Sequence, residues 1–135
     1  YCIEKYLLND DIVCATIHTK ITNDDDLNNR NIGKIILDKY NNVIYCSRSM
    51  IPYTKNGEKG NTDYYAHIGI FIFNCDYLIQ SYNKKNEYYQ TIEDLEWLKV
   101  LEQDYKIYAL ETNKHEIGVD TQEDYEYLKN KFEKI

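Results

Sequence analysis

An aspartate stands where an apolar segment ends and a helix is predicted to begin. Ile117-Gly118-Val119 stops at Asp120, and Thr121-x-x-Asp124 is a pattern typical of a helix N-terminus. In an open α/β sheet, ligands are held at such a change from strand to helix. An Asp in this place is often only a cap, because its carboxylate accepts backbone N–H groups. Thr121 can supply that cap, which leaves the Asp120 carboxylate available to Mg²⁺.

Three further side chains could contribute to chemistry, and each also has an ordinary structural interpretation. Arg48 ends a predicted strand, where it could clamp a carboxylate or be a solvated strand end. His67 opens the most apolar stretch, where it could bind a hydroxyl or be a satisfied structural histidine. Glu96 lies on a predicted amphipathic helix, where a glutamate usually faces solvent. The sequence has no Gly-rich phosphate loop and no Ser-His-Asp pattern, so these residues taken singly name no function.

The elements that must position these residues alternate between strands and helices. The predicted strands are Ile12–Ile21, two arms of a hairpin within Gly33–Arg48 around Tyr40-Asn41-Asn42, His67–Phe73 and Lys106–Leu110. The predicted helices are the end of one at Tyr1–Leu8, Cys75–Tyr82, Thr91–Leu101 and one that begins at Thr121. This alternation predicts a single α/β domain over residues 1–135 with a mixed sheet.

Some details of these elements can be predicted as well. HIGIFIF, His67 to Phe73, is so apolar that the strand is expected to be buried on both faces. Thr91–Leu101 is expected to be one amphipathic helix whose inward side chains are Ile92, Leu95, Leu98 and Leu101. Asn23–Asn31 is expected to be a polar loop in which Asp24-Asp25-Asp26 face water rather than hold a metal. A Gly- and Lys-rich loop is expected at Asn56–Asn61.

Composition limits the class of protein and of partner. The chain has 135 residues, 43% of them hydrophobic, and a net charge of −7 without a basic stripe, which argues against binding to nucleic acid or to an anionic membrane. No apolar run approaches the roughly 18 residues of a membrane span. The four cysteines lack metal or redox spacing. We therefore expect Cys14, Cys46 and Cys75 to be buried free thiols of a cytoplasmic protein.

Four motifs, taken in order, closely resemble one enzyme family. They are SRSMIPY (Ser47 to Tyr53), HIGIFIF (His67 to Phe73), TIEDLEWLKVLEQDYKI (Thr91 to Ile107) and GVDTQEDYEYL (Gly118 to Leu128). Their order and gaps resemble the C-terminal half of the 3-deoxy-manno-octulosonate (Kdo) cytidylyltransferases, from about Ile12 onward. The fold that this resemblance implies is a Rossmann-like, nucleotide-diphospho-sugar-transferase-like one, with a hairpin used in dimerisation.

The resemblance also implies an activity and a set of roles. The family transfers CMP from CTP to the anomeric hydroxyl of the acidic sugar Kdo with Mg²⁺, and it releases pyrophosphate. By analogy Asp120 would be the catalytic residue that holds Mg²⁺, and Arg48 would pair with the sugar carboxylate. His67 and Glu96 would bind sugar hydroxyls. The chain would form a homodimer through the hairpin and neighbouring strands.

Two positions of the sugar site depart from the family pattern. Phe71 stands where the family usually has Tyr, and Trp97 replaces a Gln, so two polar contacts to the sugar are absent. These changes leave open a related acidic sugar, such as a nonulosonic acid, or a non-catalytic remnant or interaction module. The family's CTP-binding half is expected to be missing here, and the chain, which starts at Tyr1 rather than Met, is expected to be a cut or processed piece that is inactive alone.

Overall fold

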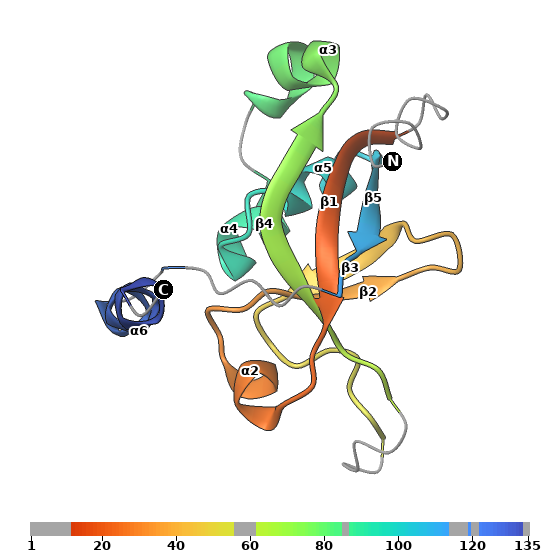
Figure 1. Cartoon of the computed structure of the whole chain (residues 1–135). Coiled ribbons are helices and arrows are strands. Elements are labelled where there is room, and N and C mark those ends of the chain that lie inside the picture. Colours follow the sequence, from red (N-terminus) through yellow and green to blue (C-terminus); the bar gives the residue numbers. More distant parts are fainter. Residues whose placement is uncertain (1–11, 56–61, 85–86, 114–118, 120–121, 134–135) are drawn as a thin grey trace.

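A five-stranded mixed sheet forms the centre of the computed structural model, which describes residues 12–55, 62–84, 87–113, 119 and 122–133 (Figure 1). The strands are β1 (Ile12–Lys20), β2 (Lys34–Leu37), β3 (Val43–Ser47), β4 (Tyr65–Phe73) and β5 (Lys106–Glu111). Their order in the sheet is β3-β2-β4-β1-β5. β1 runs antiparallel to β4 and parallel to β5, which confirms the predicted mixed α/β sheet. The predictions for Tyr1–Leu8 and Asn56–Asn61 fall outside the described residues.

The predicted hairpin is confirmed as β2 and β3, and its turn is built around Asp38. The Asp38 carboxylate accepts hydrogen bonds from the backbone N–H groups of Tyr40 and Asn42, both at 2.8 Å. Asn41 between them has a φ of 65°, a conformation that asparagine tolerates better than most residues. The Asn41 carbonyl also accepts the Ala109 N–H of β5 at 2.8 Å. The turn of the hairpin therefore contacts β5, which is the edge strand opposite β3 in the sheet order.

Two short helices replace the single helix that was predicted over Thr91–Leu101. They are α4 (Tyr88–Glu93) and α5 (Leu98–Glu102), separated by Asp94 in the left-handed conformation with a φ of 51°. The prediction of one amphipathic helix is therefore wrong, and Ile92, expected to point inward, is 60% exposed. The N–H of Leu95 bonds back to the Gln90 carbonyl, an arrangement typical of a helix end.

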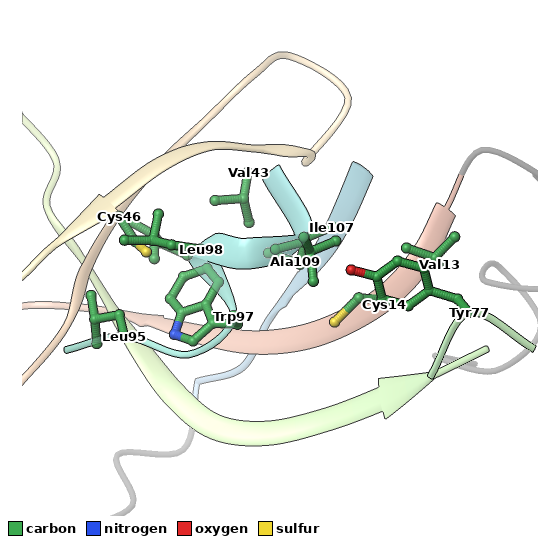
Figure 2. Close-up of a cluster of buried hydrophobic side chains, with 12 residues drawn as sticks. Val13, Cys14, Val43, Cys46, Tyr77, Leu95, Trp97, Leu98, Ile107 and Ala109 are labelled. Atoms are coloured by element: carbon green, nitrogen blue, oxygen red, sulfur yellow. The ribbon is translucent and has the colours of Figure 1, made fainter. Parts of the chain in front are cut away.

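The main core lies between the sheet and α5 with the turn before it; α5 packs against β3 and β5 and is seen behind β1 and β4 in Figure 1. Most of its buried side chains come from the strands and from residues 95–100, and the cluster is drawn in Figure 2. Its members are Val13, Cys14, Ile35, Val43, Cys46, Tyr77, Leu95, Trp97, Leu98, Val100, Ile107 and Ala109. Leu95 and Leu98 are buried as predicted, although Leu95 lies in the break before α5 and α4 itself has no buried residue.

The most apolar strand is not buried on both faces. Thr16 of β1 pairs with Phe71 of β4, whereas Ile17 pairs with Ile68, so Gly69 and Ile70 form a bulge in β4. Both bulge residues are exposed, and Ile70 is 53% exposed. The prediction of two buried faces is wrong here, since an insertion in the ladder leaves these residues without a cross-strand neighbour.

Two smaller predictions also need correction. Residues expected to form a loop contain the helix α2 (Asp24–Asn28), in which the Asn23 side chain accepts the Asp26 N–H at 2.7 Å. The consecutive aspartates occupy the first turn of α2, where negative charge suits the helix dipole. Cys75 is exposed, because it opens α3 (Cys75–Tyr77), whereas Cys14 and Cys46 are buried free thiols as predicted.

Two further helical segments complete the described chain. The π-helix η1 (Leu78–Tyr82) continues from α3, so the predicted helix over Cys75–Tyr82 is confirmed with an altered pitch. The helix α6 (Gln122–Phe132) lies apart from the sheet in Figure 1 and has no buried residues. Across the described residues, no helix has both the length and the apolar character required to cross a membrane.

Candidate functional site

Three of the predicted site residues form one aromatic group. The ring of His67 stacks on Trp97 with centroids 4.4 Å apart, and Phe71 lies 5.0 Å from His67 on a tilted plane. The ring centroids of Phe71 and Trp97 are 5.9 Å apart. Trp97 is only 4% exposed, because its side chain reaches from the start of α5 into the core (Figure 2). The departures at Phe71 and Trp97 therefore surround His67 with apolar rings.

The edge of the His67 ring is held by β1. His67 Nε2 lies 2.8 Å from the Thr16 hydroxyl, and that hydroxyl lies 2.8 Å from the carbonyl of Ile70. Burial, with a smaller contribution from neighbouring His18, lowers the pKa of His67 from 6.5 to about 4. The imidazole is therefore neutral at pH 7.

This pKa predicts a loss of stability in mild acid. A histidine whose pKa is lower in the folded protein stabilises the fold fully above pH 6.5, and the contribution is lost as the pH falls toward 4. The loss should reach about 3 kcal/mol for a pKa difference of this size. Urea unfolding at several pH values between 7 and 4 should show it, measured as the difference between the wild type and His67→Gln. An equal acid dependence of the two proteins would contradict the prediction.

Glu96 lies at the edge of the same group of rings. Its side chain is exposed, as predicted, although it belongs to the turn between α4 and α5 rather than to a helix face. Burial and then the neighbouring Glu96 carboxylate raise the pKa of Tyr82. The Tyr82 ring contacts Phe73 at 5.1 Å, and Phe73 stacks on Phe71 at 5.8 Å. Glu96 is thus a solvent-facing carboxylate beside a half-buried tyrosine.

Arg48 holds the turn that carries Glu96 and Trp97. Its Nε donates to the Glu93 carbonyl at 2.9 Å, and its Nη2 donates to the Asp94 carbonyl at 2.8 Å. Nη1 donates to the carbonyl of Arg30 at 3.1 Å. Arg48 is therefore more than a solvated strand end, because its fork ties the end of β3 to the break between α4 and α5.

Sequence reasoning missed Glu93, which completes this connection. One carboxylate oxygen of Glu93 accepts the Ser47 hydroxyl at 2.8 Å, and the other accepts the backbone N–H of Arg48 at 3.0 Å. Thr16 was missed as well. Neither residue had a signal in the local sequence pattern, since Glu93 lies 45 residues from Arg48 and Thr16 lies 51 residues from His67.

The five described residues of the predicted site therefore lie within or against one segment, residues 93–97. Arg48 bonds to its first residues, Glu96 and Trp97 belong to it, and His67 and Phe71 pack on Trp97. Asp120, the predicted metal ligand, lies outside the described residues. Within the described part of the chain, no group of three or more His, Cys, Asp or Glu side chains could hold a metal ion.

The chain is similar to curated proteins that share one enzyme name. No family model matches the sequence. The chain is 41% identical over 128 residues to the 3-deoxy-manno-octulosonate cytidylyltransferase of Fusobacterium nucleatum, an alignment that covers 95% of this chain and 51% of that protein. It is 38% identical over 112 residues to the Flavobacterium johnsoniae protein of the same name, covering 83% of this chain and 46% of that protein.

A solved structure shares the fold. The structure of CMP:2-keto-3-deoxy-manno-octonic acid synthetase complexed with CTP superposes with a TM-score of 0.85 at 22% sequence identity. The superposition covers 98% of this chain and 54% of that one. The chain thus spans about half the length of the proteins that it matches.

Proposed function

We propose that this chain, a relative of the 3-deoxy-manno-octulosonate cytidylyltransferases over about half of their length, is the sugar-binding part of such an enzyme. The reaction is the transfer of CMP from CTP to Kdo or a similar acidic sugar. The observation that carries the proposal is the convergence of five predicted sugar-site residues on the segment 93–97. Together these side chains have suitable chemistry for a ligand that carries both hydroxyls and a carboxylate.

Each residue would have a distinct task toward the sugar. The exposed Glu96 carboxylate would accept a sugar hydroxyl, and the neutral His67 ring would bind another. Arg48 would attract the sugar carboxylate with its fixed positive charge, although four of its contacts are already made with backbone carbonyls. Phe71 would supply apolar contact in place of a hydrogen bond, and Trp97, which is 4% exposed, would support the His67 ring from the core.

The transfer itself would be a displacement at phosphorus. The anomeric oxygen of the sugar would attack the α-phosphorus of CTP, the bond to the β-phosphate oxygen would break, and pyrophosphate would leave while the hydroxyl proton passes to solvent or a base. Asp120 would hold Mg²⁺, which when bound would neutralise charge on the phosphates. We also propose a homodimer through the hairpin, where Tyr40 and Ile44 are 66% and 58% exposed.

The test is an assay of the longest natural polypeptide that contains this chain. It would be incubated with CTP, Mg²⁺ and, in turn, Kdo, a sialic acid and a neutral hexose, and pyrophosphate release and the CMP-sugar would be measured. We expect CMP transfer to Kdo. Transfer only to the sialic acid would replace the sugar in the proposal. No release with any sugar would favour a non-catalytic module of this fold.

The metal role of Asp120 has its own prediction. Asp120→Asn keeps the size of the side chain and removes its charge, so the Mg²⁺-dependent rate should fall by at least the roughly 10- to 100-fold that follows loss of a hydrogen-bond partner of a metal ligand. Asp104→Asn is the matched control, because Asp104 is exposed and its left-handed φ of 63° suits asparagine. An unchanged rate for Asp120→Asn would refute the metal role.

A further inference from the structure

We infer that Thr16 holds His67 in the Nε2–H tautomer, so that Nδ1 is the hydrogen-bond acceptor that the ring offers to a ligand. Thr16 is thus a positioning residue for His67. The inference rests on the proposed function only for the identity of the ligand, a sugar hydroxyl.

The direction of each hydrogen bond follows from counting protons. The Thr16 hydroxyl has one proton, and the Ile70 carbonyl 2.8 Å away can only accept. A second carbonyl, that of Ile68, lies at 3.4 Å from the same hydroxyl. With its proton directed to a carbonyl, Thr16 Oγ1 must accept from His67 Nε2, which lies at 2.8 Å. Thr16 is 2% exposed, so bulk water does not compete for these bonds.

The bulge in β4 explains why the carbonyls are there. Gly69 and Ile70 have no partners across the ladder, so the chain of β4 bends between Ile68 and Phe71 and directs two carbonyls at Thr16. Bulges are known to re-aim groups next to functional sites. His67 of β4 pairs with His18 of β1 in the regular part of the ladder, and Thr16 lies two residues before His18 on β1. The bulge therefore supplies acceptors for the Thr16 proton, which leaves the Thr16 oxygen to accept from the ring.

The ring cannot readily exchange its two nitrogens. Trp97 covers one side at 4.4 Å, with an interplanar angle of 29°, and Phe71 lies at 5.0 Å. Rotation about the Cβ–Cγ bond would need both neighbours to move. The ring is therefore fixed in orientation by packing and in tautomer by Thr16.

The chemical consequence is selectivity at this position. A neutral imidazole with Nε2 protonated has a single remaining polar atom, Nδ1, and that atom only accepts. It suits a sugar hydroxyl that donates, and it disfavours a carboxylate or phosphate oxygen, which would face a lone pair. His67 would thus read hydroxyls of the acidic sugar and leave its carboxylate to a cation.

The test is nuclear magnetic resonance of the protein labelled with ¹⁵N-histidine at pH 7, without ligand. Long-range ¹H–¹⁵N couplings distinguish the two tautomers, and His67→Gln identifies the signals. We expect His67 to be Nε2–H in the wild type and in Thr16→Ser, which keeps the hydroxyl. In Thr16→Val the signals should shift to a mixture of tautomers. A wild-type Nδ1–H tautomer would overturn the inference even if Thr16→Val failed to fold, and so would an unchanged tautomer in a folded Thr16→Val.

A kinetic readout separates this inference from the proposed function. In an active enzyme, Thr16→Val should raise the KM for the sugar about tenfold with little change in kcat, and Thr16→Ser should restore it. A fall in kcat at constant KM would contradict the positioning role. If the enzyme transfers CMP to no sugar, the proposed function fails, whereas the tautomer measured without ligand still decides the role of Thr16.

Discussion

Trp97→Ala should lower the free energy of unfolding by about 3–5 kcal/mol, the range for removing a large buried aromatic side chain. The indole is 4% exposed and lies within the core cluster of Figure 2. Its removal would leave a cavity and would also take away the ring that stacks on His67. Denaturant unfolding followed by circular dichroism would measure the loss, since the variant has no tryptophan to report fluorescence.

Two variants at and beside this position serve as controls. Trp97→Phe keeps an aromatic ring and should cost less than Trp97→Ala. Glu96→Ala removes an exposed side chain next to it and should change stability by less than about 0.5 kcal/mol. A Trp97→Ala protein as stable as Glu96→Ala would show that the indole is not part of the core.

The variant Trp97→Gln has particular interest, because the resembled family carries Gln here. In this chain the amide would enter a cluster of apolar side chains, and burying it without a partner costs about 1–3 kcal/mol. We therefore interpret Trp97 as a residue of the hydrophobic core in this chain. A return to Gln is expected to weaken the fold rather than to restore a sugar contact.

Elements with strong local patterns could be predicted from the sequence. The β-branched run at Ile12–Lys20 and the hairpin around Asn41 were predicted within a few residues of their observed bounds. In each case the signal is local, because a β-branched composition and a residue that tolerates positive φ act within a few positions. The resemblance also rests on short motifs, each of which is local, taken in their order along the chain.

The predictions that were wrong concern features that depend on distant residues. The spacing of Leu95 and Leu98 fits one continuous helix, yet the chain breaks at Asp94 because Arg48, 46 residues away, bonds to its carbonyl. The bulge at Gly69–Ile70 has no sequence signal in an unbroken apolar run, since it is defined only by pairing with β1. The sequence predicted which residues belong to the site, but it did not predict the contacts among them.

Glu93→Ala should lower the free energy of unfolding by about 2–4 kcal/mol, because it leaves two donors at the end of β3 without their acceptor. The Ser47 hydroxyl is buried and the Arg48 N–H is close to the carboxylate, at 3.0 Å. Arg48 would also lose the Glu93 carboxylate that lies beside its backbone N–H. The same loss should loosen the segment 93–97, since the hydrogen bonds that remain between the end of β3 and this segment come from the Arg48 fork.

Glu93→Gln is the informative partner variant. Its amide oxygen can still accept one of the two bonds, but its NH₂ group would oppose the other donor, so an intermediate loss of about 1–2 kcal/mol is expected. Glu123→Gln, on the exposed first turn of α6, is the matched control for removing a charge. Urea unfolding gives the free energies, and amide hydrogen exchange at Arg48 reports the bond itself. If Arg48 exchanges no faster in Glu93→Ala than in Glu123→Gln, the carboxylate does not hold the strand end, and the order of the segment that carries Glu96 and Trp97 must come from packing alone.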